Sequence, residues 1–122
     1  INVMGRIIGA FKYAFAGIGD AFWKESSFRL EVLVGIPLAI LFCYVFWPLT
    51  AMELLFIVLA ICLVLLTELL NTAVEKTWDY LHPERLDLVG MSKDSAAGAV
   101  VVTIFFSIAV VIIIAGTHLG YF

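Results

Sequence analysis

The chain alternates between long apolar stretches and short polar segments, and three apolar stretches are long enough to cross a membrane. Residues 32–52 carry no charged side chain, residues 54–67 are uncharged and lead into an acidic segment, and residues 95–122 contain no Asp, Glu, Lys or Arg. About 20 helical residues, rising about 1.5 Å each, cross the roughly 30 Å of hydrocarbon in a bilayer. The pattern predicts transmembrane helices over about 30–48, 52–80 and 93–120.

Residues 3–24 have the periodicity of an amphipathic helix. Apolar side chains recur at steps of four, four, three and four, at Ile7, Phe11, Phe15, Ile18 and Phe22. The other side carries Arg6, Lys12, Asp20 and Lys24. Such a helix suits the surface of a membrane, with basic side chains at anionic headgroups. Packing within a small helical bundle is the alternative, and the two can both hold.

The composition excludes an ordinary soluble protein. Of the 122 residues, 64% are hydrophobic and only 14% are charged, with a mean hydropathy of +1.13, whereas soluble proteins are roughly half apolar and a quarter charged. We expect one all-α integral-membrane domain over 1–122, with an N-terminal surface helix and three transmembrane helices. We expect no nucleic-acid partner.

Basic residues are distributed unevenly along the chain. All seven lie before the first apolar stretch or around the connection between the second and the third: Arg6, Lys12, Lys24, Arg29, Lys76, Arg85 and Lys93. Because cytoplasmic segments are enriched in Lys and Arg, we expect the N-terminus and the 80–92 loop in the cytoplasm and the C-terminus outside. Residues 1–24 lack the apolar core of a cleavable signal peptide. Cys43 and Cys62 lie in apolar stretches, where we expect packing and neither a disulfide nor a metal.

An acidic stripe continues the second apolar stretch. Glu68, Asn71, Glu75 and Asp79 follow one another at steps of three, four and four, which places them within roughly 80° on one helical face. Carboxylates close to hydrocarbon are costly, so this stripe indicates a cation site, a proton path or a general base. A solvated helix end just outside the bilayer is the simpler interpretation.

A second polar cluster joins the surface helix to the first span. We expect Ser26 or Ser27 to cap this span, with Arg29 reaching the headgroups. Glu25 is expected at the same cytoplasmic depth as Glu75, so that carboxylates from two helices can share one divalent cation.

The third span opens with Ser92-Lys93-Asp94-Ser95. We expect Ser92 to be its N-cap, so that backbone N–H groups together with Lys93 attract an anion. His82 has no companion at ligand spacing and is interpreted as a surface residue.

These features together resemble what phosphoryl transfer requires: a cation site at the phosphates, a positive group, and a base for the nucleophile's proton. The chain has no Walker loop and no Gly-rich kinase loop. Any nucleotide site is therefore of another type.

The residues resemble a family of small bacterial integral-membrane lipid kinases, comprising diacylglycerol kinase and the related undecaprenol kinase. The motifs that carry the resemblance are Glu68-Leu-Leu-Asn71-Thr-Ala-Val-Glu75 with Asp79, Lys93-Asp94 before small residues, Glu25-Ser-Ser-Phe28-Arg29-Leu-Glu31, and Arg6-Ile-Ile with Tyr13 and Gly17. The resemblance covers essentially the whole chain. It implies a homotrimeric helical bundle in the bacterial cytoplasmic (inner) membrane that phosphorylates a lipid hydroxyl with Mg-ATP.

The resemblance also implies residue roles. Glu68 becomes the general base for the lipid's primary hydroxyl, Asn71 orients the reacting groups, and Glu25 and Glu75 hold the Mg²⁺ that bridges the ATP phosphates. Positions implied to contact the nucleotide are Arg6, Tyr13, Glu84, Arg85, Leu86, Lys93 and Asp94. Positions implied to contact the lipid are Arg6, Ala10, Tyr13, Phe15, Ser27, Phe28, Arg29, Glu31, Glu68 and Ala97.

The motifs do not all indicate the same lipid substrate. The 28–31 segment resembles diacylglycerol kinases, whereas 93–100 is closer to undecaprenol kinases. We favour diacylglycerol, giving phosphatidic acid, because the first motif lies nearer the expected lipid cleft. A carboxylate-lined ion or proton carrier is the alternative of another class. We also expect the site to be shared between subunits, with Glu25 and Glu68 on different chains.

Overall fold

The described part of the chain is built from helices. The computed structural model describes residues 2–84 and 86–122. Its elements are α1 (Val3–Lys24), α2 (Ser26–Leu30), the π-helical turn η1 (Glu31–Gly35), α3 (Ile36–Val45), α4 (Ala51–Leu81) and α5 (Asp87–His118). No strand occurs within the described residues, so the prediction of an all-α protein is confirmed.

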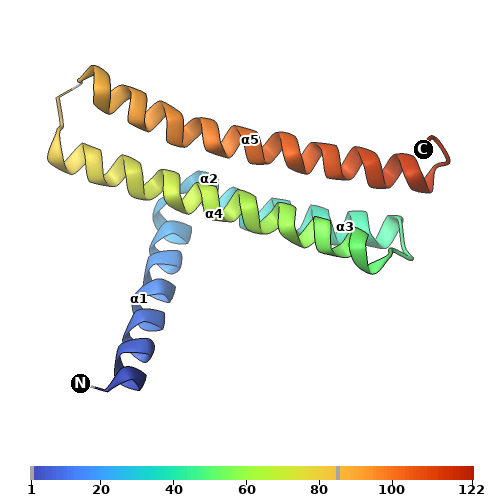
Figure 1. The fold of residues 1–122 in the computed structure, drawn as a ribbon, viewed down its shortest axis with the longest axis horizontal. Helices are drawn as coiled ribbons and strands as arrows, with labels where there is room; N and C mark the ends of the chain where they lie inside the picture. The colour runs from blue at the N-terminus through green and yellow to red at the C-terminus, as the bar shows by residue number, and fades with distance from the viewer. Residues whose placement is uncertain (1, 85) are drawn as a thin grey trace.

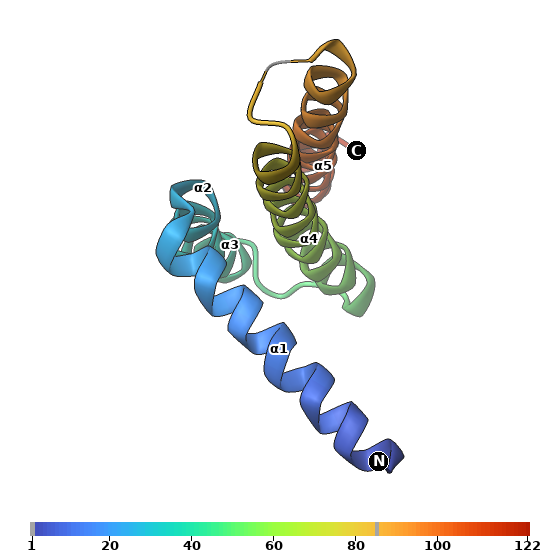
Figure 2. The ribbon, with the colours of Figure 1, turned by 90° about the vertical axis from the view of Figure 1, so that its left-hand side faces the viewer.

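The long helices α4 and α5 run antiparallel and side by side, and the segment from α2 to α3 lies along α4 (Figures 1 and 2). Three segments are long and apolar enough to cross a membrane, as predicted: Ser26–Val45, Ala51–Leu81 and Asp87–His118. With 31 and 32 residues, α4 and α5 are about 46 and 48 Å long. Both therefore exceed the roughly 30 Å of a bilayer's hydrocarbon core, so polar turns at their ends lie outside it.

The amphipathic helix α1 projects away from the bundle (Figure 1). It begins where the Asn2 side chain accepts a hydrogen bond of 2.6 Å from the Gly5 N–H. Most of its side chains are exposed, and Ala21, near its junction with the bundle, is its buried residue. The predicted helix is confirmed, whereas its position on a membrane surface stays a prediction.

Glu25 forms the corner between α1 and α2. Its extended backbone, with φ −111° and ψ 112°, ends α1, and its N–H still donates to the Ala21 carbonyl at 2.8 Å. The Arg29 guanidinium folds back onto the carbonyls of Phe22 and Trp23, at 3.3 and 3.2 Å. The prediction that Ser26 or Ser27 caps the span is therefore wrong, because Glu25 occupies the N-cap position and both serines lie inside α2.

The π-helical turn η1 directly precedes the helical turn that contains Pro37. Proline lacks an N–H and its ring crowds the carbonyl four residues earlier, which here belongs to Leu33 inside η1. A wider turn relieves that clash while the helix continues.

The third long helix begins at Asp87, earlier than the predicted residue 93, so the prediction that Ser92 is its N-cap is wrong. Asp87 complements the helix dipole in the first turn. The extended end of α4 also gives this first part of α5 a packing surface: Val89 is buried, and the Ser92 hydroxyl accepts a 2.9 Å hydrogen bond from the Trp78 indole. Residues 92–95 therefore lie inside α5 and do not form a helix N-terminus for an anion, whereas contact of Lys93 with an anion stays a prediction.

The contact between α4 and α5 contains the core of the bundle. Ile57, Val110 and Ile114 form its buried cluster. Nearer the middle, the hydroxyls of Thr67 and Thr103 lie 3.2 Å apart across the two helices. Interhelical hydroxyl contacts and close packing are the forces that hold helices together in lipid.

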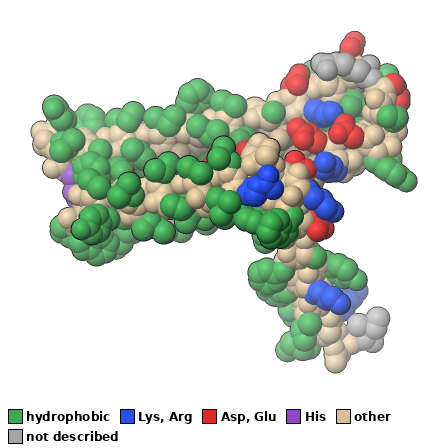
Figure 3. Space-filling view, turned by 180° about the vertical axis from the view of Figure 1, so that it is seen from behind, with side chains coloured by type: hydrophobic (Ala, Val, Ile, Leu, Met, Phe, Trp, Pro, Cys, Tyr) green, Lys and Arg blue, Asp and Glu red, His purple; other side chains and the backbone are tan. Residues whose placement is uncertain are grey.

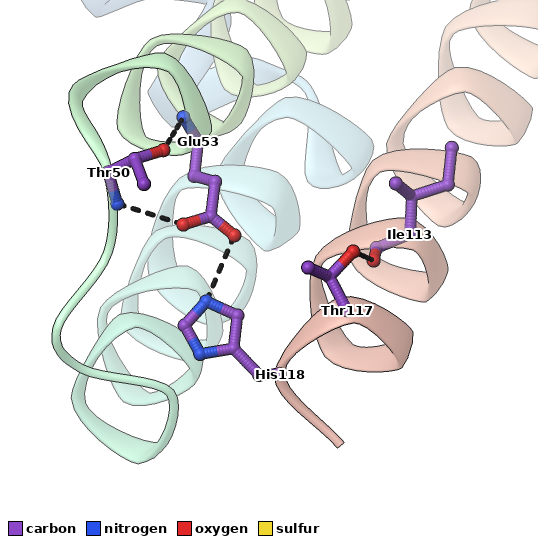
Figure 4. A network of polar contacts seen from close by, with 5 residues as sticks. All are labelled: Thr50, Glu53, Ile113, Thr117 and His118. Atoms are coloured by element: carbon purple, nitrogen blue, oxygen red, sulfur yellow. Dashed lines mark hydrogen bonds and ion pairs between the residues drawn. The ribbon is translucent and has the colours of Figure 1, made fainter. Parts of the chain in front are cut away.

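A polar network closes the end of the bundle opposite the α1 junction (Figure 4). Thr50 and Glu53 form a capping box that starts α4, with hydrogen bonds of 2.8 and 3.1 Å. The other Glu53 carboxylate oxygen lies 2.9 Å from Nε2 of His118 at the end of α5. This network joins the start of α4 to the end of α5.

Candidate active site

Charged side chains gather at the end of the bundle from which α1 departs, whereas the rest of the bundle is mainly hydrophobic on the face shown (Figure 3). They come from the α1–α2 corner, from η1, from the last part of α4 and from the first part of α5. The candidate site therefore lies where the apolar bundle meets its charged end.

Glu68 is the most enclosed of these acids. Its exposure is only 8%, and it is one of two buried polar residues in the described part of the chain. Glu25 contacts α4 through Lys76 at 3.1 Å, and Glu31 of η1 lines a cavity together with Val64, one helical turn before Glu68. The stripe predicted from helical periodicity is thus joined by acids from two further elements.

Asn71 lies between the acids of the stripe and has an unsatisfied acceptor. Its Nδ2 donates to Glu75 Oε1 at 3.5 Å. Its Oδ1 is buried and has no hydrogen-bond partner among the described residues. A buried carbonyl oxygen without a partner is costly, so this atom marks a place where a donor or a cation fits.

Glu25 faces α4 from the corner. Its Oε1 is 3.1 Å from Nζ of Lys76, and its side chain is 23% exposed. Sequence reasoning did not select Lys76, although its position beside Glu75 could have suggested an ion pair. At about 100° per residue it lies to one side of the acidic stripe.

Lys93 is held by the last acid of the stripe. Its Nζ lies 2.6 Å from Asp79 Oδ1. Asp94, next to it on α5, is exposed. Both are in the second turn of α5, so no helix N-terminus supports a contact with an anion there, and their contact with a nucleotide stays a prediction.

Residues on α1 do not join the cluster within the chain. Arg6, Ala10, Tyr13 and Phe15 are exposed on the part of α1 that projects away from the bundle (Figure 2). Their predicted contacts to nucleotide or lipid stay predictions.

The other predicted contact residues are divided between corner, loop and α5. Phe28 is 3% exposed and packs inside the corner, whereas Ser27 and Ala97 are exposed. In the loop, hydrogen bonds to the Glu84 carboxyl from its own backbone N–H and from the His82 ring lower its pKa. The His82 Nδ1 lies 3.0 Å from Glu84 Oε1. Leu86 is the N-cap residue of α5, and Arg85 lies outside the described residues.

No three Asp, Glu, His or Cys side chains of the described residues converge closely enough to hold a metal ion by themselves. Mg²⁺ typically uses one or two carboxylates and completes its shell with water and phosphate oxygens. Glu25 and Glu75, with the unpartnered Asn71 oxygen nearby, are hard oxygen donors of that kind. This donor set fits Mg²⁺ bound together with a nucleotide.

Comparison with known proteins shows which family the chain belongs to. Residues 12–115 match the model of the family described as prokaryotic diacylglycerol kinase. A diacylglycerol kinase of Synechocystis is 34% identical over 92% of this chain and 62% of its own length. The Escherichia coli K12 diacylglycerol kinase is 28% identical over 94% of this chain and 93% of its own length.

A relative named for another substrate is similar to a comparable degree. The undecaprenol kinase of Bacillus subtilis is 34% identical over 83% of this chain and 80% of its own length. The resemblance inferred from the motifs is confirmed by these matches, which cover both named branches. The chain therefore belongs to the prokaryotic diacylglycerol kinase family of membrane lipid kinases.

Proposed function

We propose that this protein transfers the γ-phosphate of Mg-ATP to the primary hydroxyl of diacylglycerol, giving phosphatidic acid and ADP. The observation that carries the proposal is the buried Glu68 carboxylate, which directly follows the uncharged residues 54–67 and is followed by the charged end of α4. A lipid hydroxyl at this boundary meets a carboxylate while its chains stay in hydrocarbon.

Glu68 acts as the general base. The hydroxyl oxygen forms a bond to the γ-phosphorus, the bond from that phosphorus to the bridging oxygen breaks, and the hydroxyl proton passes to the Glu68 carboxylate. Among the described residues no cation pairs with Glu68, so its oxygens are available to a proton. Positioned bases contribute about 10²- to 10⁴-fold to a rate.

Glu25 and Glu75 hold Mg²⁺, and the Asn71 amide orients the reacting groups beside them. Mg²⁺ neutralises charge on the phosphates when it is bound. The unpartnered Asn71 Oδ1 supports this placement because it offers a further oxygen to the cation, its water or the nucleotide.

Lys93 and Asp94 contact the phosphates, and Arg6, Tyr13, Glu84, Arg85 and Leu86 contact the rest of the nucleotide. Contact with a phosphate requires Lys93 to exchange or share its Asp79 partner, which is exposed and can accept water instead. Such surface ion pairs are weak, at about 0–1 kcal/mol, so the exchange is easy.

The lipid meets the protein at Ser27 to Glu31, at Ala97 and at Ala10 to Phe15 of α1. Of these positions, Glu31 lines a cavity of about 530 Å³ between η1, α3, α4 and α5, whose lining is apolar apart from Glu31 and Ser107. An acyl chain suits such a lining, and the cavity reaches Val64, one helical turn before Glu68.

The working form is a homotrimer in the bacterial inner membrane, with the N-terminus and the connection between α4 and α5 in the cytoplasm. Large apolar side chains of α3, such as Leu38, Ile40 and Leu41, are exposed in the single chain. Lipid and neighbouring subunits cover such faces. The distribution of basic residues supports the orientation.

Purified protein tests the proposal in vesicles with Mg-ATP and with diacylglycerol, undecaprenol or no added lipid. We expect ADP release and a labelled lipid product with diacylglycerol. Faster turnover of undecaprenol than of diacylglycerol would show that the protein is an undecaprenol kinase. Proton or cation flux without ATP consumption would support the carrier alternative and contradict the kinase reaction.

A further inference from the structure

Lys76 has no role in the reaction described above, yet its position ties the α1–α2 corner to α4. Its Nζ lies 3.1 Å from Glu25 Oε1. Of the ion pairs between described residues, the others join residues within α1, within the connecting loop, or between α4 and α5. Among the described residues, the Lys76–Glu25 pair is therefore the ionic contact between the corner and α4.

The two partners differ in how firmly their side chains are held. Glu25 has a backbone fixed at the corner by hydrogen bonds of 2.8 and 3.1 Å, and its side chain is mostly enclosed. The Lys76 side chain is 67% exposed and extends from the flank of α4. A flexible, exposed ammonium leaves the contact more easily than an anchored carboxylate does.

The pair also lies where ions can reach it. Lys76 and Glu25 both line a cavity of about 600 Å³ between α1 and α4, whose other charged lining residues are Asp20 and Lys24. A divalent cation that binds Glu25 through this cavity meets an ammonium already in contact with the same carboxylate. Two cations at one carboxylate oxygen repel each other.

We propose that Lys76 is a positioning residue that acts through Glu25. It serves as a resident counter-cation that holds the Glu25 carboxylate toward α4, and an arriving divalent cation displaces it. This inference rests on the proposed role of Glu25 as a metal ligand. It implies that the wild-type chain binds free divalent cations more weakly than a chain without the Lys76 charge.

Binding of Mn²⁺ to the full chain, without nucleotide or lipid, tests this directly through the electron paramagnetic resonance signal of free Mn²⁺. At low salt, Lys76→Met should bind Mn²⁺ about two- to fivefold more tightly, as expected for loss of an exposed ion pair. Lys76→Arg keeps the charge and should stay within twofold of wild type. The gain should shrink at high salt, because exposed charges are then screened.

Lys24→Met is the matched control, because it removes the same charge from the same cavity, but Lys24 lies 4.0 Å from Asp20. We expect a change in affinity smaller than twofold. Equal tightening by Lys24→Met and Lys76→Met would overturn the inference, since net charge alone would then explain it. Unchanged or weaker Mn²⁺ binding by Lys76→Met would overturn it as well.

Glu25→Gln separates this inference from the proposed function. It should weaken Mn²⁺ binding; if it does not, Glu25 is not a metal ligand and the proposed metal site fails. If Glu25→Gln weakens binding and Lys76→Met does not tighten it, the inference about Lys76 alone fails. Circular dichroism and gel filtration check folding, and Lys76→Gln carries the same test if the Met variant does not assemble.

Discussion

Mixing two inactive variants tests whether an active site draws on more than one chain. Arg6 and Tyr13 lie exposed on the projecting part of α1, and Tyr13 is 77% exposed. Glu25, in contrast, contacts α4, the helix that carries Glu68, within one chain: its Oε1 lies 3.1 Å from Nζ of Lys76. The arrangement predicts that Arg6 acts in the site of a neighbouring subunit, whereas Glu25 and Glu68 act together.

The expected recovery follows from random assembly. Arg6→Ala and Glu68→Ala chains are mixed one to one, unfolded and reassembled, and crosslinking confirms mixed trimers. If the two residues of a site come from different chains, each is intact with a probability of one half. About one quarter of the sites are then complete, so phosphorylation of lipid should recover to ~25% of the wild-type rate.

Glu25→Ala mixed with Glu68→Ala is the matched control. This division predicts that Glu25 and Glu68 act from one chain, so that every site carries a lesion and no activity should return. Recovery in the control with none in the Arg6 mixture would refute this division of the site. It would instead support the division first expected from the sequence, with Glu25 and Glu68 on different subunits.

Two further predictions concern the metal and the helix contact. Glu25→Gln or Glu75→Gln should raise the Mg²⁺ concentration needed for half-maximal activity at least about tenfold, since even the loss of an outer-shell partner of a metal ligand lowers metal affinity by that factor. An unaltered Mg²⁺ titration would exclude both residues as ligands. The Thr67 and Thr103 hydroxyls, 3.2 Å apart, should show a coupling of about 0.6 kcal/mol in a double-mutant cycle of unfolding in detergent micelles, the usual value for such contacts. A coupling of zero would mean that the contact contributes no stability.

The elements that depend on local patterns could be predicted from the sequence. Long uncharged stretches suffice to locate the three spans, because the thickness of a bilayer sets the length of an apolar helix that crosses it. The 3.6-residue period suffices to locate α1, because it places the apolar side chains on one face of a helix. Helix ends were predicted less well. Ser92 has the properties of an N-cap, but α5 begins at Asp87 because α4 extends far enough to pack against Val89 and Ser92.

Contacts between side chains from different helices of the site could not be predicted from the sequence, because they depend on the tertiary structure. Periodicity placed Glu68, Asn71 and Glu75 on one face, and the structure retains that arrangement. The Lys76–Glu25 contact joins residues 51 positions apart in the sequence, and no local pattern encodes such a pair. The Arg29 contacts with the α1 carbonyls likewise depend on the direction in which the chain turns at Glu25.

Steady-state kinetics of Glu68→Gln with Mg-ATP and diacylglycerol test the central claim most directly. The variant should lose about 10²- to 10⁴-fold in kcat and keep its affinity for Mg-ATP, because a general base acts in the transition state. Glu53→Gln, the same change at the opposite end of α4, should retain activity. Turnover of Glu68→Gln near the wild-type rate, or a loss confined to Mg-ATP affinity, would contradict the assignment of Glu68 as the base.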